Sequence, residues 1–364
     1  MNILIAAFII AGCGISGKPN SPAVSDTLPA SGMHAYGRTA YSETEGLELI
    51  SSAAHLGFSF TGSSFTIDAA IHDPSGHNYL QYEMDGIYRK RIKVEGKNQE
   101  PITIQATGDG RHTVWLYKAT EAQTGPVFIR KITAAGIKYL EKPPAPLIEF
   151  IGNSITCGAA ADPSEVPCGT GQYHDQHNAY MAYGPRVARA LGAEFLMSSV
   201  SGYGIYRNWN SDGPALPMVY EKTRLTADDN ELWKFEKYRP AVVSIALGTN
   251  DYSRGDGKKA RLPFDSAAFS STYIRFVQLV KSKYPEAIIL LLGSPMVGGS
   301  GGATLNTCIT SVKTAIDKLY PAAKPVQLYF FNPMTARGCS GHPSVEDHAI
   351  LANELIPVFS KLLK

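Results

Sequence analysis

The chain has 364 residues, of which 44% are hydrophobic and 18% are charged, and its formal net charge is +2. This length is enough for two domains of the usual size, about 100–200 residues each. The composition is that of a globular protein, and the absence of a basic cluster or block of like charge gives no support for nucleic-acid binding.

The chain begins with twelve residues, all but Asn2 apolar or glycine, that end directly before Cys13. A helix needs about 20 such residues to span a bilayer, so this run is too short. The stretch resembles a bacterial lipoprotein signal with Ile10-Ala11-Gly12-Cys13 as the lipobox, although it lacks the usual Lys or Arg. We expect a signal peptide over residues 1–12, a lipid anchor on Cys13 as the only membrane contact, and export to the periplasm or cell surface. The alternative is an apolar start of a cytoplasmic protein.

Residues 13–33 are rich in Gly, Ser, Pro and Ala, which predicts a flexible tether. From residue 34 to 142, short apolar runs alternate with clusters of Gly, Asp, Asn and Ser. The expected strands are 58–60, 65–67, 79–82, 92–94, 102–104, 113–117 and 127–129. Strands at this spacing predict a β-sandwich or jelly roll. Residues 143–146 contain three prolines and form the predicted linker, because proline cannot join a helix or a central strand.

After the linker, from residue 147 to 364, the pattern changes to strands alternating with helices. The expected strands are 147–151, 195–197, 242–247, 288–292 and 326–331, and the expected helices are 182–191, 272–280 and a C-terminal helix from Val345 that Pro357 is predicted to kink. This alternation predicts a parallel, doubly wound sheet.

Four fragments of this second half carry side chains suited to acyl transfer. Ser154 follows the first strand and is the candidate nucleophile, while His342 is the candidate general base. The Gly202 backbone, the Asn250 amide and the N–H of Ser154 itself are the candidate oxyanion donors. Each fragment alone also fits ordinary turn chemistry. Ligands bind at the carboxyl ends of strands in such sheets, so the fragments are expected to converge there. Other histidines are weaker candidates for the base: His348, His174 and His177.

Four cysteines follow Cys13, and they allow three pairings. We expect Cys157–Cys168, which would close a short loop beside Ser154, and consider Cys308–Cys339 as a second pair. The alternative is four buried free thiols. No cysteine or histidine spacing suggests zinc, so no metal site is expected.

The fragments around Ser154, Gly202, Asn250 and His342, in this order, resemble the SGNH (GDSL-like) hydrolase superfamily. Further fragments narrow the resemblance to carbohydrate esterase family 2: Met84-Asp85-Gly86, Gly110–Val114, Lys118-Ala119-Thr120-Glu121 and Ser201–Asn208. This resemblance implies an N-terminal jelly-roll β-sandwich over residues 34–142 and a flavodoxin-like SGNH hydrolase α/β/α domain over 147–364. It also implies a serine esterase, acetyl xylan esterase-like, that removes O-acetyl groups from xylan and glucomannan through an acetyl-enzyme without a cofactor.

Cys339 stands three residues before His342, where many SGNH enzymes have an aspartate. The family resemblance therefore implies a Ser–His dyad with the histidine oriented by a main-chain carbonyl. Three aromatic residues are candidates for stacking on sugar rings, with packing as the alternative: Tyr203, Tyr206 and Trp209.

Two other functions fit the same residues. One is an esterase for another acyl ester, such as an O-acetyl group of peptidoglycan, a lipid or a thioester. The other is a catalytically inert carbohydrate-binding lipoprotein. The partner in the favoured interpretation is an acetylated polysaccharide or oligosaccharide.

Overall fold

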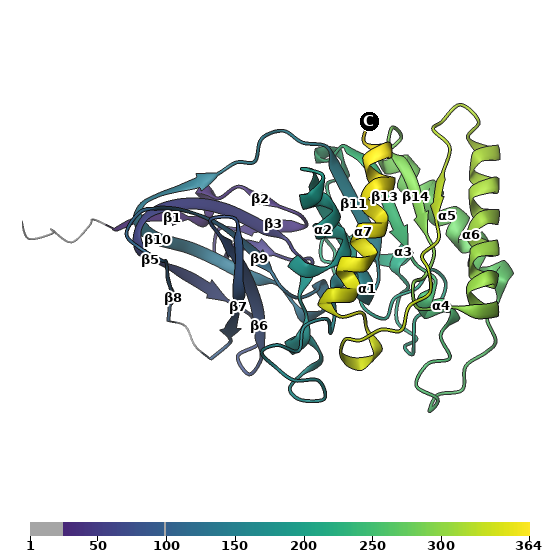
Figure 1. Ribbon diagram of the computed structural model, residues 1–364, viewed down its shortest axis with the longest axis horizontal. Helices are drawn as coiled ribbons and strands as arrows, with labels where there is room; N and C mark the ends of the chain where they lie inside the picture. The colour runs from purple at the N-terminus through teal and green to yellow at the C-terminus, as the bar shows by residue number, and fades with distance from the viewer. Residues whose placement is uncertain (1–24, 98–99) are drawn as a thin grey trace, which may run out of the picture.

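The computed structural model describes residues 25–97 and 100–364, which fold into two parts joined by residues 141–146 (Figure 1). The predicted signal peptide, the Cys13 anchor and the first part of the tether lie outside the described residues. The helices within the described ranges are all too short or too polar to cross a membrane.

The N-terminal domain is an antiparallel sheet that curls around its own core (Figure 1). Its elements are β1 (Ser25–Pro29), η1 (Ala30–Gly32), β2 (Ala35–Tyr36), β3 (Thr39–Ser42), β4 (Gly46–Leu49), β5 (His55–Ala70), β6 (His77–Met84), β7 (Ile87–Glu95), β8 (Ile102–Gln105), β9 (Arg111–Lys118), η2 (Ala122–Thr124) and β10 (Val127–Leu140). The strand order is β3-β4-β10-β5-β9-β6-β7, with β1 beside β10 and with β2 and β8 beside β5.

Alternation of side chains explains how these strands form. In β9, His112, Val114 and Leu116 are buried, whereas Arg111 and Thr113 are exposed. A period of two is that of a strand with one face on the core. The core inside the curled sheet is therefore built from alternate residues of its strands.

The predicted separation of strands 58–60 and 65–67 is wrong. They belong to one long strand, β5, although Gly62 between them has a φ of +112°. β9 pairs with residues 55–61 of this strand and β8 with residues 64–67, so partners bond to it on both sides of the bend. Shifts in register against β10 mark the irregularity, as expected for a bulged strand.

The predicted tether also extends too far. Ser25–Pro29 form β1, which pairs with Lys131–Ala135 of β10, and Leu28 is buried. Backbone pairing requires few apolar side chains, so a strand can form in a segment of polar composition. Composition alone therefore did not predict this strand.

The second domain has a parallel five-stranded sheet in the order β12-β11-β13-β14-β15. Its strands are β11 (Leu147–Gly152), β12 (Glu194–Ser199), β13 (Pro240–Ala246), β14 (Ile288–Leu292) and β15 (Gln327–Tyr329). Its helices are α1 (Ser154–Cys157), η3 (Tyr173–Gln176), η4 (Ala179–Met181), α2 (Tyr183–Ala190), α3 (Leu216–Val219), η5 (Phe235–Lys237), α4 (Thr249–Tyr252), α5 (Ser266–Lys283), α6 (Gly299–Leu319), η6 (Cys339–Gly341) and α7 (Val345–Leu362). In chain order the strand arrangement is 2-1-3-4-5, the flavodoxin-like arrangement.

Helices cover both faces of this sheet (Figure 1). α2 and α7 bury Val187, Leu351 and Phe359 against one face, while α5 and α6 bury Phe276 and Ile309 against the other. The C-terminal helix continues through Pro357 to Leu362. The layered arrangement leaves the carboxyl ends of the strands free to carry loops.

Helix α6, from Gly299 to Leu319, was not among the predicted helices. Its buried side chains recur at helical spacing: Leu305, Cys308, Ile309, Val312 and Ile316. The helix begins with Gly299-Ser300-Gly301-Gly302, and glycine is a poor helix former, so the start of the helix is not predicted from these residues.

Arg38 connects the two domains through a fully buried guanidinium. It donates to Ser198 Oγ at 3.0 Å, to the Tyr220 carbonyl at 2.9 Å and to the Lys222 carbonyl at 2.8 Å. Burial raises the pKa of the Glu149 carboxyl, and the charge of Arg38 opposes that rise. Ser198 Oγ, which accepts from Arg38, donates to Glu149 Oε1 at 2.5 Å, so one hydroxyl connects the arginine to a carboxyl group buried in the second domain.

Replacing Arg38 with Ala should lower the free energy of unfolding by about 3–5 kcal/mol, because three acceptors lose their donor and the buried Glu149 loses a nearby positive charge. Urea denaturation followed by tryptophan fluorescence measures the loss. Arg130→Ala is the matched control: Arg130 lies 3.5 Å from Asp68 on the surface, and its removal should cost less than about 1 kcal/mol. Equal losses in the two variants would contradict a special role for Arg38.

Candidate active site

The four predicted site residues lie together at the carboxyl edge of the parallel sheet. Ser154 begins α1 directly after β11, Gly202 follows β12, Asn250 lies in α4 after β13, and His342 precedes α7. All four line one open cleft of about 640 Å³. The fold thus brings together residues that are separated by up to 188 positions in the chain.

Ser154 and His342 form a hydrogen-bonded pair. The distance from Ser154 Oγ to His342 Nε2 is 2.9 Å, and His342 Nδ1 lies 3.0 Å from the Ser340 carbonyl oxygen. Because a carbonyl only accepts, Nδ1 carries the proton and Nε2 is left to accept from the serine hydroxyl. This is the protonation state that a general base requires.

The acidic residues after His342 are bonded elsewhere. Glu346 accepts from Ser344 Oγ at 2.7 Å, and Asp347 accepts from Arg337 Nε at 2.6 Å. The group facing His342 Nδ1 is therefore a main-chain carbonyl, as the family resemblance implied.

The residues around Ser154 explain how its hydroxyl comes to lie in the cleft. The Asn153 side chain caps α1 by accepting from the Ile155 N–H at 3.1 Å. Gly152 must lack a side chain, because a Cβ there would lie 2.0 Å from Thr156 Oγ1. The chain can therefore turn sharply from β11 into α1 and place the Ser154 hydroxyl in the cleft.

The candidate oxyanion donors lie on two neighbouring loops. Gly202 has a φ of +77°, a left-handed conformation that favours glycine. Asn250 Nδ2 donates to the Tyr203 carbonyl at 2.8 Å, which uses one of its two amide hydrogens and leaves the other for a ligand. The buried carboxylate of Asp251 accepts from the backbone N–H groups of Ile205 and Tyr206, and so holds the loop after Gly202.

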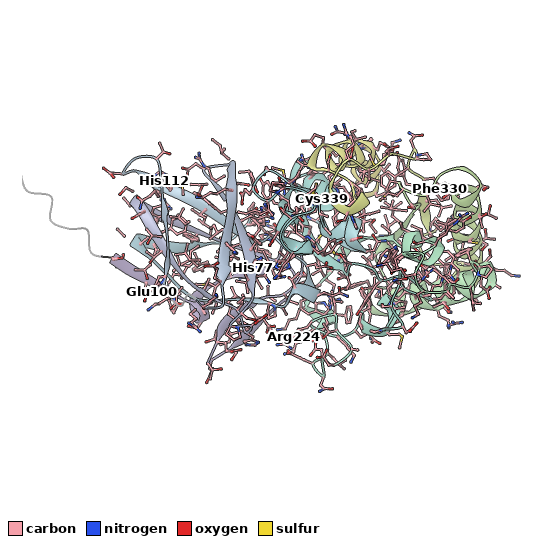
Figure 2. The ribbon with its side chains drawn as sticks, turned by 90° about the horizontal axis from the view of Figure 1, so that it is seen from below. His77, Glu100, His112, Arg224, Phe330 and Cys339 are labelled. Carbon is pink, nitrogen blue, oxygen red and sulfur yellow. A yellow bond between two sulfur atoms is a disulfide. The ribbon has the colours of Figure 1, made fainter. Side chains whose placement is uncertain are left out.

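The expected disulfide pairings are wrong. The structure has a Cys168–Cys339 disulfide, while Cys157 and Cys308 are buried free thiols. Cys157 lies in α1 beneath the site and Cys308 lies inside α6, whereas Cys339 lies next to the His342 loop, near the start of the yellow C-terminal helix in Figure 2. Proximity in the chain suggested Cys157–Cys168, but the loop after α1 carries Cys168 across to the segment before α7.

This disulfide places Tyr173 in the site, a residue that the sequence analysis did not identify. Its hydroxyl lies 3.3 Å from His342 Nε2 and 3.5 Å from Ser201 Oγ. Tyr173 lies in η3, five residues after Cys168, in a loop rich in glycine and polar residues. No local pattern in that loop distinguishes a site residue.

Of the three aromatic candidates, Trp209 lines the cleft and is 42% exposed. Tyr203 packs against the core, and Tyr206 packs edge-on against Phe264 and Phe269. The packing alternative therefore describes Tyr203 and Tyr206, whereas Trp209 is placed to contact a ligand.

The competing histidines have other partners. His348 is fully buried in α7, and burial lowers its pKa to about 3. His177 lies 3.3 Å from Glu121 in the interior. His174 lies 3.0 Å from the carbonyl oxygen of His77, at the boundary between the domains.

One group in residues 25–97 and 100–364 has a geometry compatible with a metal ion: His77, His174 and Asp175, with ligand atoms within 4.8 Å of one another. His77 lies on the side of the N-terminal domain that faces the second domain (Figure 2). Its imidazole is hydrogen-bonded to Asp175, whose other carboxylate oxygen accepts from the Gln172 N–H at 2.7 Å. Each of the three side chains therefore has a hydrogen bond within the protein.

The fold and this edge of the sheet are those of an SGNH-type ester hydrolase. Comparison with protein families agrees: residues 35–144 match the carbohydrate esterase 2 N-terminal family, and residues 150–346, more than half of the chain, match the GDSL-like lipase/acylhydrolase family. The chain belongs to the GDSL-like lipase/acylhydrolase family, and its two domains are those of carbohydrate esterase family 2. The resemblance and the fold class inferred from the sequence are confirmed.

Individual proteins are similar to this chain along nearly its whole length. An acetylxylan esterase/glucomannan deacetylase of Cellvibrio japonicus is 26% identical, over 99% of this chain and 97% of that protein. A family two carbohydrate esterase from Clostridium thermocellum, solved in complex with cellohexaose, is 28% identical with a TM-score of 0.78, over 91% of this chain and 98% of that one. A Cellvibrio japonicus family two esterase has a similar fold, with 24% identity and a TM-score of 0.79, over 94% of this chain and 98% of that one.

The pH dependence of ester hydrolysis should report His342. Burial lowers the pKa of this imidazole below its ordinary 6.5, partly opposed by the bond to the Ser340 carbonyl. Since a general base must be neutral, kcat/KM should fall on the acid side with an apparent pKa below 6.5 and stay level through neutral pH.

A pH-stat assay of acetate release from 4-nitrophenyl acetate measures this profile, with Ser154→Ala at each pH as the control for uncatalysed hydrolysis. An acid limb at or above pH 6.5 would contradict the assignment of His342, whose pKa is lowered, as the base.

Proposed function

We propose that this chain is a serine deacetylase that removes O-acetyl groups from plant cell-wall polysaccharides such as xylan and glucomannan. The observation that carries the proposal is the 2.9 Å contact between Ser154 Oγ and His342 Nε2 in an open cleft that Trp209 also lines. The relative named acetylxylan esterase/glucomannan deacetylase, which this chain matches along nearly its whole length, supports the choice of substrate.

The proposed reaction begins with proton transfer. His342 Nε2 takes the proton of Ser154 as its Oγ attacks the acetyl carbonyl carbon. The carbonyl oxygen becomes an oxyanion, which receives hydrogen bonds from the Ser154 and Gly202 N–H groups and the free amide hydrogen of Asn250. His342 then returns the proton to the departing sugar hydroxyl, leaving an acetyl group on Ser154.

The second half-reaction repeats these steps with water. His342 accepts a proton from water, whose oxygen attacks the acetyl-enzyme carbonyl, and Ser154 leaves as its hydroxyl is reprotonated. The Ser340 carbonyl orients the imidazole throughout, although it stabilises imidazolium less than a carboxylate does. The open cleft suits a polymer substrate because a sugar chain can enter and leave along it.

Acetate release from acetylated xylan and glucomannan tests the proposal. Ser154→Ala should lose at least about a thousandfold in kcat, and Asn250→Ala about a hundred- to a thousandfold, because it removes one oxyanion donor. Ser271→Ala, on the exposed face of α5, is the matched serine control and should keep full activity.

Each contrary result points to another function. Activity confined to long-chain nitrophenyl esters would favour a lipid or thioester substrate. Release from O-acetylated peptidoglycan alone would favour that polymer. Binding to xylan without any acetate release would favour an inert carbohydrate-binding protein.

We also propose that residues 1–12 are a lipoprotein signal and that Cys13 carries the lipid, so that the enzyme acts at the periplasmic or outer surface. The lipobox-like sequence supports export, and so does the Cys168–Cys339 disulfide, because disulfides persist in oxidising compartments. A polysaccharide too large to enter the cell is accessible to an enzyme there.

Cys13→Ser should abolish incorporation of labelled palmitate and release the protein from the membrane fraction of a bacterial host. Cys308→Ser, which changes a buried thiol in α6, is the control that should keep both the label and the membrane association. Label that persists in Cys13→Ser would contradict the proposed anchor.

A further inference from the structure

Glu121 belongs to the N-terminal domain, but its carboxylate is bonded to the second domain. The residue follows β9 in the loop that leads to η2, and it is 1% exposed. Its Oε2 accepts from the Ser201 backbone N–H at 2.6 Å. Ser201 directly precedes Gly202, the candidate oxyanion donor after β12.

Three donors converge on this one carboxylate. Besides the Ser201 N–H, they are the Cys157 thiol at 3.5 Å and His177 Nε2 at 3.3 Å. The Ala160 N–H donates to His177 Nδ1 at 3.2 Å, so the imidazole proton lies on Nε2 and faces Glu121. An ionised carboxylate suits such a site because all its hydrogen-bonding positions are acceptors.

The surroundings keep Glu121 charged. Burial alone would raise its pKa, but the bonds from His177 and Ser201 hold the pKa below the ordinary value. Lys118, also fully buried, donates to the Glu121 carbonyl and to Thr124 Oγ1, which fixes the loop, and burial lowers the pKa of its amine to about 7.

The three donors belong to three segments that surround the reacting pair. Ser201 precedes Gly202, Cys157 lies three residues after Ser154, and the ring of His177 packs edge-on against Tyr173 with centroids 4.8 Å apart. Tyr173 in turn contacts His342. One carboxylate from the N-terminal domain thus connects three segments of the second domain. They are the oxyanion loop that contains Ser201 and Gly202, helix α1 that contains Ser154, and the loop that contains Cys168 and His177.

We infer that Glu121 is a positioning residue for the oxyanion hole, through which the N-terminal domain completes the active site of the hydrolase domain. By holding the Ser201 N–H, Glu121 fixes the residue whose peptide bond carries the Gly202 N–H. A displacement of about 1 Å at such a site can cost about a hundredfold in rate. The inference rests on the proposed function, because it takes Gly202 as a donor to the oxyanion.

Glu121→Gln tests the inference in the full chain. The amide has one acceptor and one donor end, so one of the converging donors meets an N–H group instead of an oxygen. We expect kcat for 4-nitrophenyl acetate to fall about 10- to 100-fold while KM changes less than about twofold, because the oxyanion forms only after binding. The inhibition constant of methylboronic acid, which adds to a serine hydroxyl as a tetrahedral anion, should rise in parallel.

Glu83→Gln is the matched control. Glu83 is also an N-terminal-domain carboxylate at the domain boundary, but it accepts from Tyr180 Oη at 2.8 Å, a bond that glutamine can also accept. This variant should keep the wild-type kcat and boronate affinity. If Glu121→Gln does not fold, Glu121→Asp keeps the charge but draws the carboxylate back by one methylene, and it should show the same loss in kcat at nearly constant KM.

Several outcomes would overturn the inference: wild-type kcat in folded Glu121→Gln, an equal loss in Glu83→Gln, a change confined to KM, or unchanged boronate affinity despite a lower kcat. Ser154→Ala separates this failure from failure of the proposed function. If hydrolysis depends on Ser154 but not on Glu121, only the positioning role is wrong. If hydrolysis does not depend on Ser154, the proposed function itself is wrong.

Discussion

The hydrogen bond between His342 Nδ1 and the Ser340 carbonyl is the interaction on which the proposed chemistry depends. It fixes the tautomer that leaves Nε2 free for the Ser154 hydroxyl, 2.9 Å away. The group that accepts from Nδ1 is a main-chain carbonyl, so the orientation of the imidazole depends on the position of the backbone at Ser340. The Cys168–Cys339 disulfide joins that backbone to the loop that contains Tyr173. On the other side of His342, Ser344 caps the N-terminus of α7.

Buried charges also explain why the two domains form one functional unit. The N-terminal domain inserts Arg38 toward Glu149 on one side and Glu121 toward Ser201 and His177 on another. Each charged group gains its hydrogen bonds only when the domains are together, and an unpaired buried charge is costly. The domain boundary is therefore held by specific polar contacts rather than by apolar packing alone.

The residues that line the cleft come both from strand ends and from loops. Ser154 and Asn250 follow β11 and β13, which have neighbouring strands on both sides, whereas Gly202 follows the edge strand β12. Trp209 and Tyr173 come from long loops that cross the edge of the sheet. In open α/β folds, ligands bind at the carboxyl ends of the strands, where the loops supply further contacts.

The sequence by itself determined the two-domain organisation, the parallel sheet and the four residues that meet at its edge. Each depends on local signals: period-two runs, a proline-rich linker, and polar residues at strand ends. Tertiary structure alone decided the rest. It pairs Cys168 with Cys339, brings Tyr173 to His342, and inserts Glu121 beneath the oxyanion loop. These contacts join segments 80 to 171 residues apart, so no local period or spacing encodes them, and only the packing of the domains and loops brings the partners within bonding distance.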